Sequence, residues 1–378
     1  MTSVLPPPVW VADPFALDRL LRSLAPQHRL AVDTESNSLH AYREQVCLVQ
    51  FSIPGTDYLI DPLALHDLSP LDTLFSNPKI EKVFHAAEYD LICLRRDFGI
   101  TFANIFDTMQ AARILGYKQV GLDSVLAEKL GVTMNKHYQK ADWGQRPLSR
   151  EMLNYARLDT HHLLELRDSL QVELQERGRW ELAREEFARL AGGNGVIKPE
   201  VPAWQRVKGT QHFTRRQLTV LNELCLWRED QAEKMDRPVF KVMDDKRLVS
   251  IALSNPKTPK ELETLNLTPR QVHTFGEDIL LAVGRGRKAN LINRPPADRP
   301  DPAVLDRLNG LSGWRKAVAQ KIGIESDLIL PKSWMHAIAA QNPKTIQELC
   351  AIMPDSPWRF ETFSADILKT IHAREISS

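Results

Sequence analysis

Hydrophobic and polar positions follow two different periods in the first half of the chain. Short runs of residues that are mostly apolar, or that alternate between apolar and polar, predict strands at residues 29–34, 46–53, 57–60 and 82–85. Longer stretches with apolar residues three or four positions apart predict helices at residues 15–24, 87–98, 108–115, 122–130 and 149–190. Strands that alternate with helices are typical of an α/β domain, in which helices cover a central sheet.

The second half of the chain contains an internal repeat. Residues 255–262 (NPKTPKEL) match residues 342–349 (NPKTIQEL) at an offset of 87 positions, and the pair Trp227–Arg228 matches Trp314–Arg315 at the same offset. Each copy is long enough to build its own core, so we expect two copies of one small all-α domain.

Segments rich in Gly and Pro predict linkers at residues 191–204 and 293–302. The resulting division predicts domains at residues 1–195, 210–290 and 300–378.

Composition places the chain among globular proteins, with 43% apolar residues in 378. No apolar run reaches the roughly 18 to 20 residues of a membrane helix, and the first residues lack a secretion signal, so we expect a cytoplasmic protein with no membrane partner. We expect a monomer, although the sequence leaves the oligomeric state open. The four cysteines are far apart and form no CxxC pair, which argues against a structural zinc site or a redox couple.

The net charge of +1 conceals a difference between the two halves. Residues 1–200 carry 22 Lys and Arg against 27 Asp and Glu, and residues 201–378 carry 27 against 21. An acidic first half suits divalent cations, whereas a basic second half suits a polyanion, although an ordinary solvated surface also fits these numbers.

Three segments of the first half place carboxylates where a metal site could use them. Asp33 and Glu35 lie two residues apart on a predicted strand, so their side chains leave the same face. Asp90 lies in a predicted helix, and Tyr155 and Asp159 are neighbours on another because they are four residues apart. Each fragment alone is a weak signal, since an Asp at a strand end is usually a cap and a Tyr–Asp pair is usually exposed.

The order of these fragments resembles the three motifs of the DEDD exonucleases, in the subgroup with tyrosine in the third motif. The resemblance covers roughly residues 10–190 and implies an RNase H-like fold with a mixed sheet flanked by helices. It also implies that Asp33, Glu35, Asp90 and Asp159 bind two divalent metal ions, Mg²⁺ or Mn²⁺, and that Tyr155 holds the attacking water. Four carboxylates and a phosphate would balance the four positive charges of such a pair.

Further segments indicate which branch of the DEDD exonucleases the chain resembles. Residues 106–115 and 136–149 look like the ribonuclease D branch of these enzymes, and residues 210–285 and 302–374 resemble HRDC domains, which occur twice in bacterial ribonuclease D. The resemblance implies an RNA partner, with tRNA precursors as substrates, and helical domains that bind nucleic acid or shape the path to the active site.

Four residues are candidates for substrate contact. Lys140, Trp143 and Arg146 combine cations with an aromatic ring within a few residues, which suits single-stranded nucleic acid because rings stack on bases while cations neutralise phosphates. A surface loop with one buried Trp fits the same residues equally well. His85 precedes Asp90 by five residues and could reach the scissile region, or it could be a packed histidine at the end of a strand.

The sequence therefore predicts a metal-dependent 3′ to 5′ exoribonuclease that releases nucleoside 5′-monophosphates and processes tRNA 3′ ends. A 3′ to 5′ DNA exonuclease is the first alternative, because the carboxylate site does not itself require a 2′-hydroxyl. A catalytically silent nucleic-acid adaptor is the second, and it is disfavoured because all five motif positions hold the residue type that the chemistry needs.

Overall fold

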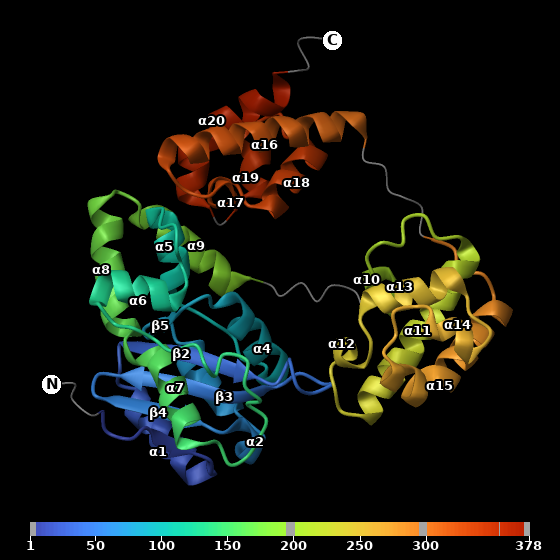
Figure 1. Ribbon diagram of the computed structural model, residues 1–378. Helices are drawn as coiled ribbons and strands as arrows, with labels where there is room; N and C mark the ends of the chain where they lie inside the picture. Colours follow the sequence, from blue (N-terminus) through green and yellow to red (C-terminus); the bar gives the residue numbers. More distant parts are fainter. Residues whose placement is uncertain (1–4, 194–200, 295–300, 355, 374–378) are drawn as a thin grey trace. The chain divides into compact units, whose positions relative to one another are not determined.

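A mixed sheet forms the centre of the first domain (Figure 1). The computed structural model describes residues 5–193, 201–294, 301–354 and 356–373, so the predicted linkers lie partly outside the described residues. The sheet order is β1-β4-β3-β2-β5-β6, and its strands are β1 (Val9–Val11), β2 (Arg29–Ser36), β3 (Val46–Ile53), β4 (Thr56–Ile60), β5 (Glu81–Phe84) and β6 (Ile105–Asp107). Because β2 pairs antiparallel with β3 and parallel with β5, it lies inside the sheet with a neighbour on each side.

Several strands and helices differ from the sequence prediction, which also missed the short helices between residues 62 and 75. The prediction missed β1 and β6, because three residues are too few to show a period. The single helix predicted over residues 149–190 is three helices: α7 (Arg150–His161), α8 (Leu163–Glu176) and α9 (Trp180–Gly192). The chain turns between α8 and α9 at Gly178, whose φ of +64° is a conformation that glycine adopts without strain.

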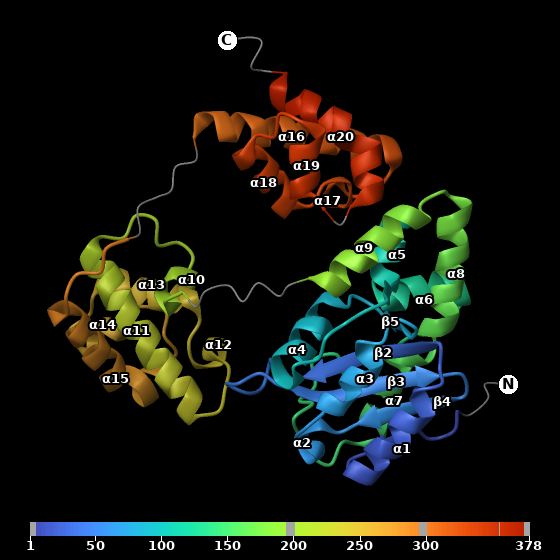
Figure 2. The ribbon, with the colours of Figure 1, turned by 180° about the vertical axis from the view of Figure 1, so that it is seen from behind.

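Helices cover both faces of the sheet, which Figures 1 and 2 view from opposite sides. One face packs Val32 and Phe51 against α1 (Pro14–Leu24) and α4 (Glu88–Phe98). The other face packs Ala31 and Val83 against α5 (Thr108–Leu115), α8 and α9. Four further helices belong to the domain: α2 (Pro62–Leu65), η1 (Ser69–Leu71), α3 (Asp72–Phe75) and α6 (Leu122–Leu130).

Helix α7 has its own apolar contact with the sheet. Met152 and Ala156 are buried in a cluster with Leu48 of β3 and Leu59 of β4. This contact places α7 on the face toward which Asp33 and Glu35 point, because Leu48 lies opposite Glu35 in the β2–β3 ladder.

Two helical domains follow, as the repeat predicts. The first contains α10 (Ala203–Arg206), α11 (Arg215–Lys234), α12 (Val239–Val242), α13 (Asp245–Ser254), α14 (Pro259–Glu263) and α15 (Pro269–Lys288). The second contains α16 (Pro302–Ile322), α17 (Ser326–Ile329), α18 (Lys332–Gln341), α19 (Ile346–Ile352) and α20 (Pro357–His372). Trp227 packs edge-on against Phe275 in the first domain, and Trp314 packs in the same way against Phe363 in the second. The two copies therefore share one core arrangement, and the predicted fold class is confirmed.

The second helical domain belongs to the same compact unit as most of the sheet domain. Arg359 of α20 is completely buried and pairs with Glu185 and Glu186 of α9, with its Nη2 2.8 Å from Glu186 Oε2. Its guanidinium also lies 5.6 Å from the ring centre of Trp334. Residues 37–45 and the described residues between 201 and 294 form a separate compact unit.

Candidate active site

Three carboxylates meet at one point of the first domain. Asp33 and Glu35 leave the same face of β2, and Asp159 approaches them from α7. One oxygen from each lies within 4.8 Å of the others, which is close enough for all three to bind one metal ion. Asp90 and Tyr155 line the same cavity, whose volume is about 450 Å³. The five residues of the DEDD pattern are thus brought together from three distant segments of the chain.

The position of Asp90 is fixed by bonds between α4 and two strands. Asp90 lies in the first turn of α4, and its carboxylate accepts a hydrogen bond from the hydroxyl of Thr34, the residue between Asp33 and Glu35. The backbone N–H of Ala87 donates to Asp107 Oδ2 at 2.8 Å, just before α4 begins. Asp107 also accepts from two N–H groups of α5 and so caps that helix.

Tyr155 is held between two aromatic rings. Its ring centre lies 5.9 Å from that of Tyr138 and 6.1 Å from that of Trp143. Burial and the nearby carboxylates Asp159 and Glu35 raise the pKa of Tyr155 well above its ordinary value. The phenol therefore keeps its proton at neutral pH, so it can orient a water molecule by hydrogen bonding but cannot act as the base.

Burial raises the pKa values of all four carboxyl groups, and repulsion within the group adds to this for Asp33 and Glu35. Burial is the largest cause for Asp33 and Glu35, and the charges of Asp90 and Asp159 raise both pKa values further. Burial raises the pKa of Asp90 and of Asp159 to about 7. Such a cluster retains protons near neutral pH unless cations replace them. A set of oxygen donors with this charge fits hard divalent ions.

One buried polar group beside the carboxylates has no bonding partner. Gln50 of β3 lies directly opposite Asp33 in the antiparallel ladder, so the two side chains leave the same face of the sheet. Within the described residues, neither its amide nitrogen nor its amide oxygen has a hydrogen-bond partner, although the side chain is completely buried. An unpaired amide in this position costs free energy.

The candidate substrate contacts lie in different surroundings. His85 lines the cavity and bonds through Nδ1 to Thr108 Oγ1 at 2.9 Å, and burial lowers its pKa to about 4, so its ring is neutral at neutral pH. Lys140, Trp143 and Arg146 are not among the described residues that line the cavity. Trp143 is only 1% exposed, and Arg146 donates to Asp61 and to backbone oxygens. In this structure Trp143 and Arg146 stabilise the chain around α7, and their predicted contacts with RNA stay predictions.

Other cavity residues were missed by the sequence analysis. Lys136 lines the cavity and pairs with Asp123 at 2.9 Å, and Tyr89 lines it with 48% of its surface exposed. The available signals were the position of Tyr89 directly before Asp90 and the basic, aromatic segment that begins at residue 136.

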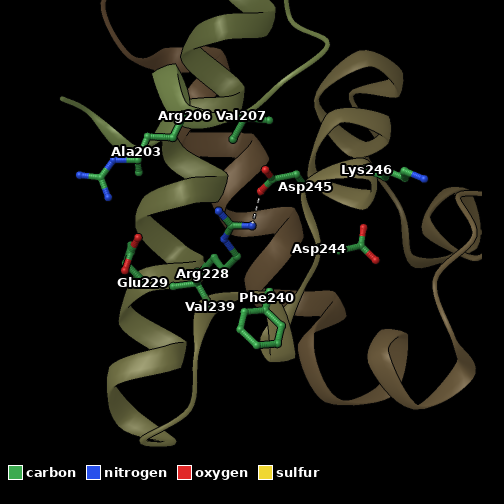
Figure 3. A pocket seen from close by; sticks show the side chains of 10 residues that line it. All are labelled: Ala203, Arg206, Val207, Arg228, Glu229, Val239, Phe240, Asp244, Asp245 and Lys246. Atoms are coloured by element: carbon green, nitrogen blue, oxygen red, sulfur yellow. Dashed lines mark hydrogen bonds and ion pairs between the residues drawn. The ribbon is translucent and has the colours of Figure 1, made fainter. Parts of the chain in front are cut away.

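A second cavity, of about 650 Å³, lies in the first helical domain (Figure 3). Its lining includes three basic and three acidic side chains, so opposite charges are mixed. Arg228 is bonded there to Asp245 at 2.8 Å. Among its described lining residues this cavity has no three carboxylates close enough to share a metal ion and no excess of positive charge, so it lacks the groups that the predicted chemistry needs.

Comparisons with known proteins show the family to which the domains belong. Residues 8–175 match a family described as 3′-5′ exonuclease, and residues 217–283 and 304–371 match the HRDC domain. The chain is 32% identical to ribonuclease D of Jannaschia sp. over 92% of this chain and 91% of that protein. It is 30% identical to ribonuclease D of Pseudomonas paraeruginosa over 96% and 97% of the two chains.

Solved structures show the same fold. Escherichia coli RNase D, an exoribonuclease involved in structured RNA processing, is similar with a TM-score of 0.70 and 24% identity over 97% of this chain and 99% of that one. The catalytic core of RRP6 from Trypanosoma brucei is similar with a TM-score of 0.63 and 28% identity over 77% of this chain and 82% of that one. With its exonuclease domain, acidic cluster and paired HRDC domains, the chain belongs to the ribonuclease D family of divalent-metal-dependent 3′-5′ exoribonucleases.

Proposed function

We propose that Asp33, Glu35, Asp90 and Asp159 hold two divalent cations, Mg²⁺ or Mn²⁺, at which the 3′-terminal phosphodiester of RNA is hydrolysed to release a nucleoside 5′-monophosphate. The observation that carries the proposal is the meeting of Asp33, Glu35 and Asp159 within 4.8 Å, beside Asp90 and Tyr155. The bound ions would offset charge on the phosphate and lower the pKa of the attacking water.

The side chains of the cavity have separate tasks in this proposal. Tyr155 orients the attacking water through its protonated phenol, and Glu35 shares this task because it lies beside the same cavity. His85 presents a neutral ring that can donate or accept a hydrogen bond near the terminal nucleotide. Lys136 supplies a positive charge for the RNA phosphates.

A direct test measures product release from matched 3′-labelled RNA and DNA in the presence of Mn²⁺. The proposal expects mononucleotides from RNA, little product from DNA, and no product from either with Asp33→Asn. A clear preference for DNA would favour the alternative function, a 3′ to 5′ DNA exonuclease. Full activity of Asp33→Asn would show that Asp33 is not a metal ligand that the reaction needs. Mn²⁺-soaked crystals should give two anomalous peaks among the four carboxylates.

We propose structured RNAs such as tRNA precursors as the natural substrates. Support comes from the paired HRDC domains and from the basic stretches of residues 201–216 and 285–294. Trimming of a tRNA precursor with a 3′ extension should stop near the mature end and should weaken as salt rises. Uniform digestion of structured and unstructured RNA would count against this substrate class.

We also propose that the protein acts as a cytoplasmic monomer with domains at residues 1–195, 210–290 and 300–378. The described helices include none that is both long enough and apolar enough to cross a lipid bilayer. Sedimentation equilibrium tests the monomer, limited proteolysis tests the domain boundaries, and cell fractionation tests the location.

A further inference from the structure

A buried hydrogen-bond network joins α7 to the sheet on the flank away from the cavity. Its centre is Asp57 of β4, which accepts hydrogen bonds from three side chains. Arg157 Nε donates to Asp57 Oδ2 at 2.8 Å, and Ser52 Oγ donates to Asp57 Oδ1 at 2.6 Å. His161 Nδ1 lies 3.0 Å from both carboxylate oxygens, and Thr160 Oγ1 lies 2.7 Å from Ser52 Oγ. We call these five residues the Asp57 network.

The network is shielded from solvent and ionised at its centre. The side chain of Asp57 is 1% exposed and that of Arg157 is 4% exposed. Burial alone would raise the pKa of Asp57, but hydrogen bonds from His161, Ser52 and Arg157 outweigh it and hold the pKa below its usual range. A buried ion pair of this kind adds little net stability compared with apolar packing, whereas its directional bonds fix one geometry.

The network and the metal site use opposite flanks of the same helix. Tyr155 and Asp159 are four residues apart and share one flank, while Arg157 and His161 are also four apart and lie two positions further on. Two positions correspond to about 200° around an α-helix. No member of the Asp57 network is among the described residues that line the cavity. The bonds to β3 and β4 therefore fix the rotation of α7 without touching the reacting groups.

The rotation of α7 matters because its catalytic groups must match ligands on a different element. Asp33 and Glu35 belong to β2, whereas Asp159 belongs to α7, and the three meet within 4.8 Å. A helix with side chains has a radius of about 5 to 6 Å, so a rotation of about 10° would move Asp159 by roughly 1 Å. A displacement of that size at a reacting site costs on the order of 100-fold in rate.

We infer that Asp57, acting with Arg157, is a positioning residue that sets Asp159 and Tyr155 for metal binding through the rotation of α7. The inference rests on the proposed metal site and adds to it a buried contact about 100 residues away in sequence from α7. Asp57 makes no contact with substrate or metal in this role.

The test replaces Asp57 by Asn in the full chain and measures Mn²⁺ binding directly. Asn has nearly the same shape, but it lacks the charge that holds Arg157. We expect Mn²⁺ affinity by calorimetry to fall about 10- to 100-fold, as for other residues that orient metal ligands. The Mn²⁺ concentration for half-maximal activity should rise by the same factor, while KM for RNA at saturating Mn²⁺ stays within about twofold. Arg157→Lys, which keeps the charge and one donor, should retain part of the affinity.

A matched control breaks another buried ion pair that lies outside the site. Glu185→Gln weakens the contact with Arg359, so it should lower the melting temperature and leave Mn²⁺ affinity unchanged. The inference is overturned if Asp57→Asn behaves like this control, with a lower melting temperature and Mn²⁺ affinity within twofold of the unsubstituted chain.

A milder variant keeps the test decisive if Asp57→Asn does not fold. Ser52→Ala removes one hydrogen bond to Asp57 and one contact with Thr160. It should weaken Mn²⁺ binding by at least about threefold, and unchanged binding would overturn the inference. If the unsubstituted chain itself bound no Mn²⁺, the proposed metal site would fail, and this inference would fail with it.

Discussion

Replacing Asp159 by Asn should stabilise the protein when no metal is bound. Burial raises the pKa of Asp159 from its ordinary 3.8 to about 7, so forming its charge inside the fold is costly above neutral pH. A pKa difference of about three corresponds to about 4 kcal/mol, which is the burial cost that removal of this charge should return at pH 8. The substitution should also make it less costly to ionise Asp33 and Glu35, because the charge of Asp159 raises the pKa values of both groups.

The sign of the pH dependence follows from proton binding. Between about pH 4 and pH 7 the folded protein keeps a proton on Asp159 that the unfolded chain has already lost, so stability falls as pH rises through this window. Asn does not titrate, so the stability of Asp159→Asn does not fall in this way as the pH rises. Its advantage should be about 1.5 kcal/mol at pH 5 and should approach about 4 kcal/mol at pH 8.

Urea unfolding with EDTA, at pH 5 and at pH 8, measures both values. Equal stability of the two proteins at pH 8, or an equal difference at both pH values, would refute the reasoning. Excess Mn²⁺ should reverse the order, because metal binding stabilises the unsubstituted chain and the variant has lost a ligand.

Three further substitutions probe the site and its support. Tyr155→Phe should lower kcat about 100-fold with little change in KM, because only the water-orienting hydroxyl is removed, and steady-state kinetics on a labelled RNA would show it. Gln50→Met should raise the metal-free melting temperature, by an amount that corresponds to about 1 to 3 kcal/mol, because it removes the unpaired buried amide; an unchanged or lower value would mean that the amide is satisfied in solution. Arg359→Met should cost about 3 to 5 kcal/mol in urea unfolding because Glu185 and Glu186 lose their buried cation, whereas a neutral result would mean that these carboxyl groups become protonated or hydrated.

Much of the fold could be predicted because its long elements carry clear periods. The strand that bears Asp33 and Glu35 begins with the apolar run Leu30–Val32, which predicts a strand, and the two-residue period of any strand places both carboxylates on one face. The strands β1 and β6 and the breaks around α8 could not be found in this way, since three residues or one turn leave no periodic signal.

The candidate site was predictable in its residue types but less so in its surroundings. The order of the acidic residues led to a metal-site prediction, and the structure brings those residues to one cavity. Trp143 shows why the surroundings of the site could not be predicted. A tryptophan beside cations in the sequence fits a stacking surface and a buried core equally well until the exposure of its side chain is known. The Asp57–Arg157 pair had no sequence signal, since its partners are 100 positions apart and neither belongs to a motif.

The buried contact made by Arg359 limits how this chain can be shortened. A fragment that ends after α9 would keep Glu185 and Glu186 but lose the guanidinium that neutralises them, together with the backbone N–H of Arg359 that donates to Glu185 Oε2 at 3.1 Å. Work on an isolated nuclease domain would therefore begin with Glu185 lacking its cation and Glu186 paired only with Arg189, both on newly exposed surface. Pairing such a fragment with Glu185→Gln and Glu186→Gln, or keeping the C-terminal helical domain attached, is the physically sound starting point.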